Sequence, residues 1–191
     1  MDPKKMEEGI RRFLEGLGER FEGDDLEKTP LRVAKAWAED LVSGYGLEPA
    51  DEVTWTAAPE GAGLVALRDV AFASVCVHHL LPFTGRAHVA YLPGRRLAGL
   101  SKLGRVVDAL SRRLQIQERL TAQIADALAD ALEPRGVAVV LEAEHTCMTL
   151  RGVRKEGSRL TTVATRGVFA DDSSARREVL AVLGCGSGSA G

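Results

Sequence analysis

Two short clusters of cysteine and histidine contain the side chains of this chain that are best suited to chemistry. One is CVHH at residues 76–79, and the other is HTC at residues 145–147; each falls at the end of a predicted strand. Zinc is bound by thiolate sulfur and imidazole nitrogen, and a catalytic zinc site uses three protein ligands and keeps a position for water. Cys76, His79 and Cys147 supply such a set, because the Cys-x-x-His spacing lets one turn direct both side chains to one point. We therefore expect a zinc site there, with two unligated histidines close by.

Each of these residues also has a plainer interpretation. An unpaired cysteine is often a small core residue, and a cysteine–histidine pair can act as nucleophile and base. Cys76 and Cys147 could form a disulfide if they are adjacent, but a reducing compartment disfavours it. The third cysteine, Cys185, lies in a Gly/Ser-rich tail, where we expect no role. His88 lies in the middle of a predicted strand, where a structural or solvent-facing histidine is the default.

Basic residues gather at two further places and suggest a site for a polyphosphate. Ser101, Lys102 and Arg105 fall in the first turn of a predicted helix, where backbone N–H groups and the positive end of the helix dipole favour phosphate. The second cluster follows the Cys147 strand and consists of Arg151, Arg154, Lys155 and Arg159. A solvated charged face is the alternative for both clusters. Glu118 opens the next predicted helix, where an acid is favourable for the dipole alone.

The spacing of apolar residues predicts the elements that must position these groups. Residues 6–17, 29–41, 101–110 and 118–132 have helical spacing. Thr29 is expected to cap the second of these helices, with proline as its first residue. Four stretches rich in β-branched or alternating residues predict strands, at residues 64–75, 83–92, 137–144 and 160–169.

The order of these elements is α-α, β-β, α-α, β-β, which predicts an α+β fold with a four-stranded antiparallel sheet and a helix pair on one face. We expect an N-terminal helical segment at residues 1–48, a main domain at 64–183 and a flexible tail at 184–191, with the polar connection 49–63 as the boundary. An open sheet leaves two edges exposed, and self-association is one way to protect them.

The composition is that of an ordinary globular protein. The chain has 191 residues, of which 45% are hydrophobic, and 25 Lys and Arg face 27 Asp and Glu. This near-neutral balance gives no general attraction to nucleic acid or to an anionic membrane, and no run of about 18 apolar residues is present that would span a bilayer. An odd set of three cysteines and the lack of a secretory signal favour a reducing compartment. We therefore expect a cytoplasmic protein without nucleic-acid or membrane partners.

Four stretches are specific enough to compare with a known family. They are, in order, KTPLRVAKAW, FASVCVHHLLPFTGRAHVAYLP, GLSKLGRVVDALSRRLQIQERLT and EAEHTCMTLRGVRKEGS. They resemble GTP cyclohydrolase I in the order of that family, and the resemblance extends from about Lys28 to Phe169. The resemblance implies the tunnelling fold, a toroidal homodecamer with active sites at subunit interfaces, and zinc-dependent hydrolytic opening of the imidazole ring of GTP. The implied products are formate and 7,8-dihydroneopterin triphosphate, in the first step of tetrahydrofolate and pterin biosynthesis.

The resemblance also implies a role for individual residues at the matching positions. The implied zinc ligands are Cys76, His79 and Cys147. The implied catalytic residues are His78 and His145. The implied substrate-binding residues are Ser101, Lys102, Arg105, Gln117, Glu118 and Arg151. Among these, Glu118 would accept hydrogen bonds from N1–H and the 2-amino group of guanine, a donor pair that adenine lacks.

One position departs from the family's usual pattern, in which a glutamate stands between the cysteine and the first histidine; this sequence has Val77. A carboxylate there can orient a neighbouring histidine, so a GTP-binding relative without turnover stays an alternative. Another is a paralogue that opens the same ring for a specialised pathway such as deazapurine synthesis. A nucleobase deaminase is disfavoured because its His-x-Glu and Pro-Cys-x-x-Cys signatures are absent. A purely structural zinc site would need a fourth ligand, for which Cys185 is a poor candidate.

Overall fold

The computed structural model describes residues 1–19 and 26–184 of the chain. The chain divides into two compact units, Met1–Ser43 and Gly44–Gly191, a few residues before the connection in which a boundary is expected. Apart from Gly184, the expected flexible tail lies outside the described residues, and so does Cys185.

The N-terminal unit is helical. Its elements are α1 (Pro3–Gly16), α2 (Thr29–Lys35) and a π-helical turn η1 (Ala36–Leu41). Asp2 caps α1, because its carboxylate accepts a hydrogen bond from the Lys5 N–H at 3.2 Å and so satisfies a donor left open by the helix. In α2 the N-cap is Lys28, and Thr29 already lies in the first turn, so the expected cap at Thr29 is wrong by one residue.

The second unit is built on a sheet of five strands. They are β2 (Val65–Cys76), β3 (Pro82–Leu92), β5 (Leu114–Gln115), β6 (Gly136–His145) and β7 (Leu160–Gly167). The spatial order is β5-β2-β3-β6-β7, and every neighbouring pair is antiparallel except β5 with β2, which is parallel. The predicted four-stranded antiparallel sheet is confirmed, with β5 as an addition. A two-residue strand has no periodicity, so the sequence does not predict it.

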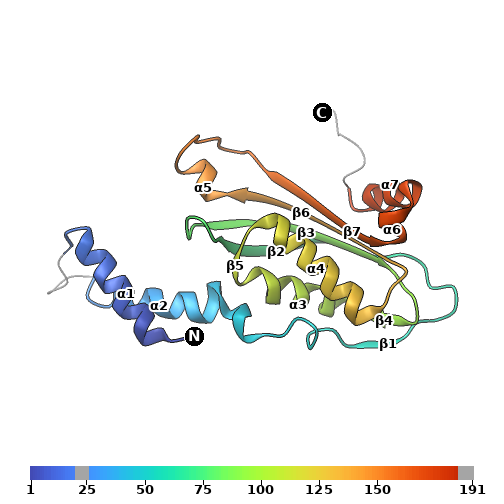
Figure 1. Ribbon diagram of the computed structural model, residues 1–191, viewed down its shortest axis with the longest axis horizontal. Coiled ribbons are helices and arrows are strands. Elements are labelled where there is room, and N and C mark those ends of the chain that lie inside the picture. The colour runs from blue at the N-terminus through green and yellow to red at the C-terminus, as the bar shows by residue number, and fades with distance from the viewer. Residues whose placement is uncertain (20–25, 185–191) are drawn as a thin grey trace. The chain divides into compact units, whose positions relative to one another are not determined.

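Two long helices cover one face of this sheet, as expected (Figure 1). They are α3 (Leu100–Ser111) and α4 (Gln117–Leu132). Their apolar faces, which include the fully buried Leu103 and Leu128, form one core with strand residues such as Val89 and Val139. This arrangement confirms the predicted α+β fold with a helix pair on one face.

A second pair of helices covers part of the opposite face, and the sequence does not predict it. These helices are α6 (Val168–Asp171) and α7 (Ser173–Val182). Because alternate residues of a strand face opposite sides, Ala138 and Val140 of β6 point away from α3 and α4, and they pack with Phe169, Val179 and Leu183. Only Val179 is fully buried within α7, so this short helix has a weak amphipathic pattern.

Smaller elements complete the structure. A separate two-stranded antiparallel sheet joins β1 (Trp55–Ala57) to β4 (Arg96–Ala98), and a one-turn helix, α5 (Thr146–Thr149), follows β6. A 3-10 turn at Ser43–Gly46 joins the two units. Within residues 1–19 and 26–184, no helix combines the length and the apolar character needed to cross a membrane.

Candidate metal centre and active site

The turn between β2 and β3 places three of the predicted site residues together. Cys76 is the last residue of β2, and the turn closes on it twice: its N–H donates to the Leu81 carbonyl oxygen, and its own carbonyl oxygen accepts from the Leu80 N–H, both at 2.9 Å. This tight turn brings Nδ1 of His78 to 3.8 Å and Nδ1 of His79 to 4.0 Å from the Cys76 sulfur. The Cys-x-x-His spacing thus directs both side chains to one point.

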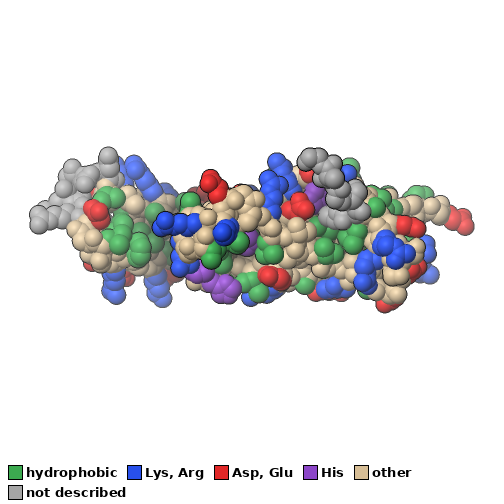
Figure 2. Space-filling model, turned by 90° about the horizontal axis from the view of Figure 1, so that it is seen from above, with side chains coloured by type: hydrophobic (Ala, Val, Ile, Leu, Met, Phe, Trp, Pro, Cys, Tyr) green, Lys and Arg blue, Asp and Glu red, His purple; other side chains and the backbone are tan. Residues whose placement is uncertain are grey.

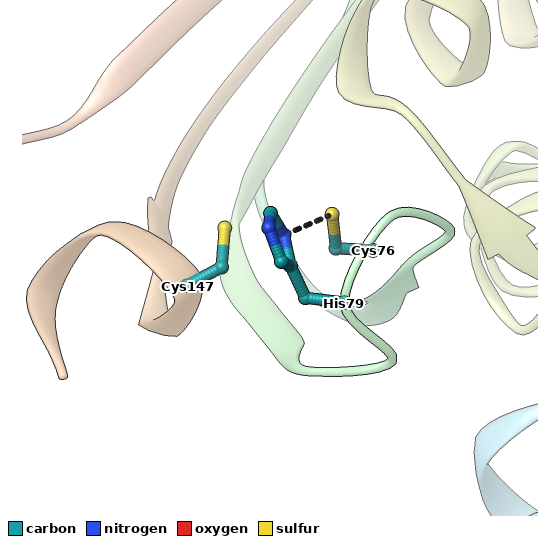
Figure 3. A group of neighbouring side chains, drawn as sticks. All are labelled: Cys76, His79 and Cys147. Atoms are coloured by element: carbon teal, nitrogen blue, oxygen red, sulfur yellow. Dashed lines mark hydrogen bonds between the residues drawn. The ribbon is translucent and has the colours of Figure 1, made fainter. Parts of the chain in front are cut away.

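Cys147 reaches the same point from the neighbouring strand. β3 and β6 pair with Phe83 opposite His145, which sets the end of β6 beside the turn. Cys147 follows two residues later in α5, and the ligand atoms of Cys76, His79 and Cys147 all lie within 4.8 Å of one another. Figure 3 shows the imidazole of His79 between the two thiols, which come from the turn and from α5.

This donor set fits zinc. Two thiols and an imidazole are ligand types of zinc sites, and three protein ligands leave a position open, as in catalytic sites. Burial raises the pKa of the Cys147 thiol, and the nearby Cys76 thiol raises it further. A divalent cation would offset both effects, because it stabilises the thiolate form. Both cysteines are free thiols, so both sulfur atoms are available as ligands.

His145 is held beside this cluster by an aromatic ring and an amide. Its imidazole stacks on the buried ring of Phe83, with centroids 4.4 Å apart and planes 6° from parallel. Its Nε2 lies 2.8 Å from Oε1 of Gln117. Burial lowers the pKa of His145 below the ordinary histidine value, while the charge of Glu118 acts in the opposite direction. The neutral ring is favoured, and one of its nitrogens can then accept a proton, as a general base requires.

Gln117 is the most enclosed of the predicted substrate-binding residues. Its side chain is 1% exposed, and its Nε2 donates to the carbonyl oxygens of Leu141 at 3.0 Å and Leu160 at 2.9 Å. The same nitrogen lies 3.1 Å from Oγ1 of Thr162. No local pattern in the sequence marks Thr162 or Phe83, because their contacts join residues far apart in the chain. Direct contact between Gln117 and substrate stays a prediction.

The predicted phosphate-binding residues on α3 lie away from the thiols and histidines. Ser101, Lys102 and Arg105 stand in the first turns of α3. The other end of α3 leads to β5, where Gln115 pairs with Cys76, and a helix of 12 residues is about 18 Å long. In Figure 1, β4, which precedes α3, and α5 lie near opposite ends of the sheet. The structure therefore does not bring the two groups together within one chain.

The remaining predicted residues are exposed in this chain. Glu118 lies in the first turn of α4, and Arg151 follows α5. His78 and His79 are exposed as well, and histidine side chains reach the surface in Figure 2. Val77 is 39% exposed, and its N–H donates to a β5 carbonyl oxygen at 3.0 Å, so its backbone belongs to the turn while its side chain adds no ligand.

His88 has a structural role, in line with its default interpretation. Its side chain is buried, and its Nδ1 accepts a hydrogen bond from the Asp69 N–H at 3.2 Å. Asp69 has φ of 59°, in the left-handed region, where β2 loses its regular register with β3 between Leu67 and Val70. His88 therefore stabilises a bulge and stands apart from the site.

Comparison with known proteins points to one family. The profile of the family described as GTP cyclohydrolase I matches residues 6–184, a range that contains every predicted site residue. The GTP cyclohydrolase 1 of Deinococcus radiodurans is 48% identical over 183 residues, which are 95% of this chain and 84% of that protein. Those of Streptococcus agalactiae and Bacillus subtilis are each 48% identical over 181 residues, 94% of this chain and 96% and 95% of their own lengths.

Among solved structures, the apo form of an archaeosine synthase QueF-Like is similar with a TM-score of 0.48 at 20% sequence identity. The match covers 56% of this chain and 97% of that chain.

Proposed function

The chain belongs to the GTP cyclohydrolase I family, and we propose that it catalyses the hydrolytic opening of the guanine imidazole ring of GTP. The products are formate and 7,8-dihydroneopterin triphosphate, the starting compound of tetrahydrofolate and pterin biosynthesis. The observation that carries the proposal is the cluster of Cys76, His79 and Cys147, whose ligand atoms lie within 4.8 Å of one another, with His78 and His145 beside it.

The reaction is a hydrolysis followed by a rearrangement. Water adds at C8 of guanine, the ring opens, and C8 leaves as formate; the ribose then undergoes an Amadori rearrangement and closes onto the aminopyrimidine with loss of water. The net change is the uptake of water and the release of formate. No electrons leave the system, so no nicotinamide is required.

Zinc bound by Cys76, His79 and Cys147 would supply Lewis acidity and a lowered pKa for a water molecule. The proton transfers fall to the two other histidines. We assign to His78 the protonation of the guanine ring nitrogen as the ring opens, because it lies next to the ligand set and an imidazole can both give and accept a proton. His145 is the second proton-transfer group, since burial favours its neutral form.

Glu118 selects the base in this proposal. Its carboxylate is exposed in the first turn of α4 and close enough to His145 for its charge to act on that ring. There it would accept hydrogen bonds from N1–H and the 2-amino group of guanine. Adenine lacks this pair of donors, and a carboxylate that gives up water to a bound base without gaining donors in return is costly.

The triphosphate is bound in this proposal by residues that a second subunit supplies. Ser101, Lys102 and Arg105 lie at the far end of α3 from Cys76, and the positive end of that helix favours phosphate. Arg151, which follows α5, would complete the set from the subunit that holds zinc. This separation supports a homo-oligomer with active sites between subunits, and the family's decamer is the assembly we expect.

A cytoplasmic location without nucleic-acid or membrane partners is also part of the proposal. The free thiols of Cys76 and Cys147 support a reducing compartment. The near-neutral charge of the chain supports the lack of a nucleic-acid partner.

Val77 supports one alternative function, that of a relative that binds GTP but does not convert it. Its side chain replaces the carboxylate that the family usually has beside the ligand set, so any hydrogen bonding by that carboxylate is lost. The ligand set is complete without it, which is why we place ring opening first. A paralogue that supplies a specialised pathway would show the same site and the same first products.

Mass analysis of the products of zinc-loaded protein and GTP tests the proposal directly. Formate and dihydroneopterin triphosphate are expected. Unchanged GTP, in a sample with one zinc per chain, would instead support the binding relative. The variant Val77→Glu separates the two ideas further: if Val77 alone had abolished turnover, the glutamate would restore it.

A further inference from the structure

We infer that Gln117 is a positioning residue: its amide holds the imidazole of His145 with the proton on Nε2 and leaves Nδ1 free to act on the substrate. The inference rests on the proposed function, in which His145 transfers a proton, and it adds the residue that selects which ring nitrogen does so. It gives Gln117 a role that does not require contact with substrate.

The neighbours of the Gln117 amide decide which way it faces. Its Nε2 lies 3.0 Å from the Leu141 carbonyl oxygen and 2.9 Å from that of Leu160, and carbonyl oxygens only accept. An amide oxygen in that place would face two acceptors with no proton between them. Oε1 must therefore be on the other side, 2.8 Å from Nε2 of His145. Because Oε1 also only accepts, Nε2 of His145 is the donor.

Two threonines keep the amide in this orientation. Oγ1 of Thr121 donates to the backbone carbonyl oxygen of Gln117 at 2.7 Å and lies 2.6 Å from Oγ1 of Thr162. Since Thr121 gives its proton to that carbonyl, Thr162 donates to Thr121, and the Thr162 oxygen accepts from Nε2 of Gln117 at 3.1 Å. A turned amide would break this chain of bonds in a place where the side chain is 1% exposed and water cannot replace them.

The ring of His145 is then fixed in two ways. Stacking on Phe83, at 4.4 Å between centroids, sets the plane of the imidazole, and the bond to Gln117 sets its rotation within that plane. Among the described residues, Nδ1 of His145 has no hydrogen-bond partner. A proton-transfer group held in place before substrate binds loses no rate to reorientation.

The test compares the wild type with Gln117→Met and with a matched control, Gln115→Met, all as zinc-loaded full-length protein. Gln115 is also fully buried, at 2% exposed, and its amide nitrogen donates to Leu110 and Gln123 rather than to a histidine. The first readout is the tautomer, from ¹⁵N NMR of histidine-labelled protein. The chain has four histidines, and His145→Ala identifies the signal of interest. We expect the Nε2–H form in the wild type and in Gln115→Met, and its loss in Gln117→Met.

The second readout is kinetic. Gln117→Met should lower kcat about 10- to 100-fold, the usual size for removing a partner that orients a functional group. KM for GTP should change less than about threefold, because the inference gives Gln117 the task of positioning His145. A large rise in KM with an unchanged kcat would contradict the inference and support the predicted direct contact of Gln117 with substrate. Zinc content and the kcat of Gln115→Met should stay near the wild-type values. In the His145→Ala background, Gln117→Met should lower the residual kcat by less than about twofold, because the two residues act as a unit.

Three results would overturn the inference: the Nδ1–H tautomer in the wild type, a normal kcat in Gln117→Met, or a full additional loss in the His145→Ala background. The wild-type tautomer decides the matter even where a variant does not fold. If wild-type protein releases no formate from GTP, the proposed function fails, and the tautomer measurement still tests the orientation of His145 separately.

Discussion

The imidazole of His145 lies flat against the phenyl ring of Phe83, with 4.4 Å between the centroids and 6° between the planes. Phe83 is fully buried and is itself braced by Phe72, whose ring meets it edge-on at 6.1 Å. Packing in the hydrophobic core therefore fixes the plane of the His145 imidazole in the site. The orientation of a residue proposed to transfer protons thus depends on how Phe83 packs in the core.

Replacing Phe83 by leucine should therefore affect both stability and turnover. We expect Phe83→Leu to lower the free energy of unfolding by about 1–3 kcal/mol through lost packing. It should also lower kcat about tenfold, because His145 loses the surface that orients it. Phe72→Leu is the matched control, since Phe72 touches Phe83 and is not stacked on His145. Denaturant unfolding and steady-state kinetics measure the two effects, and an equal loss of kcat in both variants would contradict this role of the stack.

Removal of one thiol should abolish metal binding. In Cys147→Ala the site keeps one thiol and one imidazole, which is too few ligands for a tight zinc site. We expect the dialysed variant to contain little zinc, and its kcat to fall by more than about 100-fold. Cys185→Ala changes the cysteine that we exclude from the site and should keep one zinc per chain. Metal analysis by mass spectrometry checks both, and tightly held zinc in Cys147→Ala would remove Cys147 from the ligand set.

His78→Ala should remove a proton-transfer group without removing a ligand. We expect kcat to fall about 10²- to 10⁴-fold, the range for general acid–base catalysis, with zinc content unchanged. Leu80→Gly is a control in the same turn: Leu80 has φ of 54°, which glycine adopts readily. Its kcat should stay within about threefold of the wild type. Formate release measures turnover, and near-normal rates in His78→Ala would reassign the proton transfer.

Glu118 should determine the preference for guanine. Hydrogen bonds to a charged group contribute about 1.5–3 kcal/mol, so Glu118→Ala should raise KM for GTP about 10- to 100-fold. Inosine triphosphate lacks the 2-amino group, and the wild type should use it less well than GTP. That difference should shrink in Glu118→Ala. Unchanged binding of GTP in the variant would show that the carboxylate does not contact the base.

Two variants that are each inactive should regain activity when they are mixed in one oligomer, if each site is shared between subunits. Lys102→Ala damages the proposed phosphate-binding half and His78→Ala the zinc-binding half. In one chain Lys102 lies in the first turn of α3, whereas His78 lies beside Cys76, which pairs with the strand that follows the other end of α3. In mixed oligomers made by dissociation and reassembly, about a quarter of the sites should combine two intact halves. Formate release should rise toward that fraction of the wild-type rate. A mixture no more active than its components would place both residues in the same site of one chain.

The metal-ligand cluster could be predicted from the sequence because its signal is local. Cysteine and histidine at short spacing define a site by residue type, and the strands that carry them are long and rich in β-branched residues. The structure brings Cys76, His79 and Cys147 together as expected. Their use as zinc ligands, like the other assigned roles, stays a prediction.

The residues that position the side chains of the site could not be predicted in the same way. The contact between Gln117 and Thr162 spans 45 residues of sequence, and it depends on how α4 lies on β7. Neither residue type suggests a partner. The strand β5 and the helix α7 were missed for a related reason, since short elements are fixed by tertiary contacts rather than by their own periodicity.

Insertions should be tolerated very unequally along this chain. Gln115 pairs with Cys76 in the sheet, and α4 begins only two residues later with Gln117. One extra residue between them would rotate α4 by about 100° around its axis, because a helix has about 3.6 residues per turn. The amide of Gln117 would then leave the core, and Glu118 would turn away from His145. An added residue in the exposed stretch 152–157, after Arg151, would disturb local turn bonds such as that from the Lys155 N–H to the Met148 carbonyl oxygen, but no strand pairing and no helix rotation. We therefore expect activity to be lost on insertion in the 115–117 connection and to be affected less by insertion at 152–157.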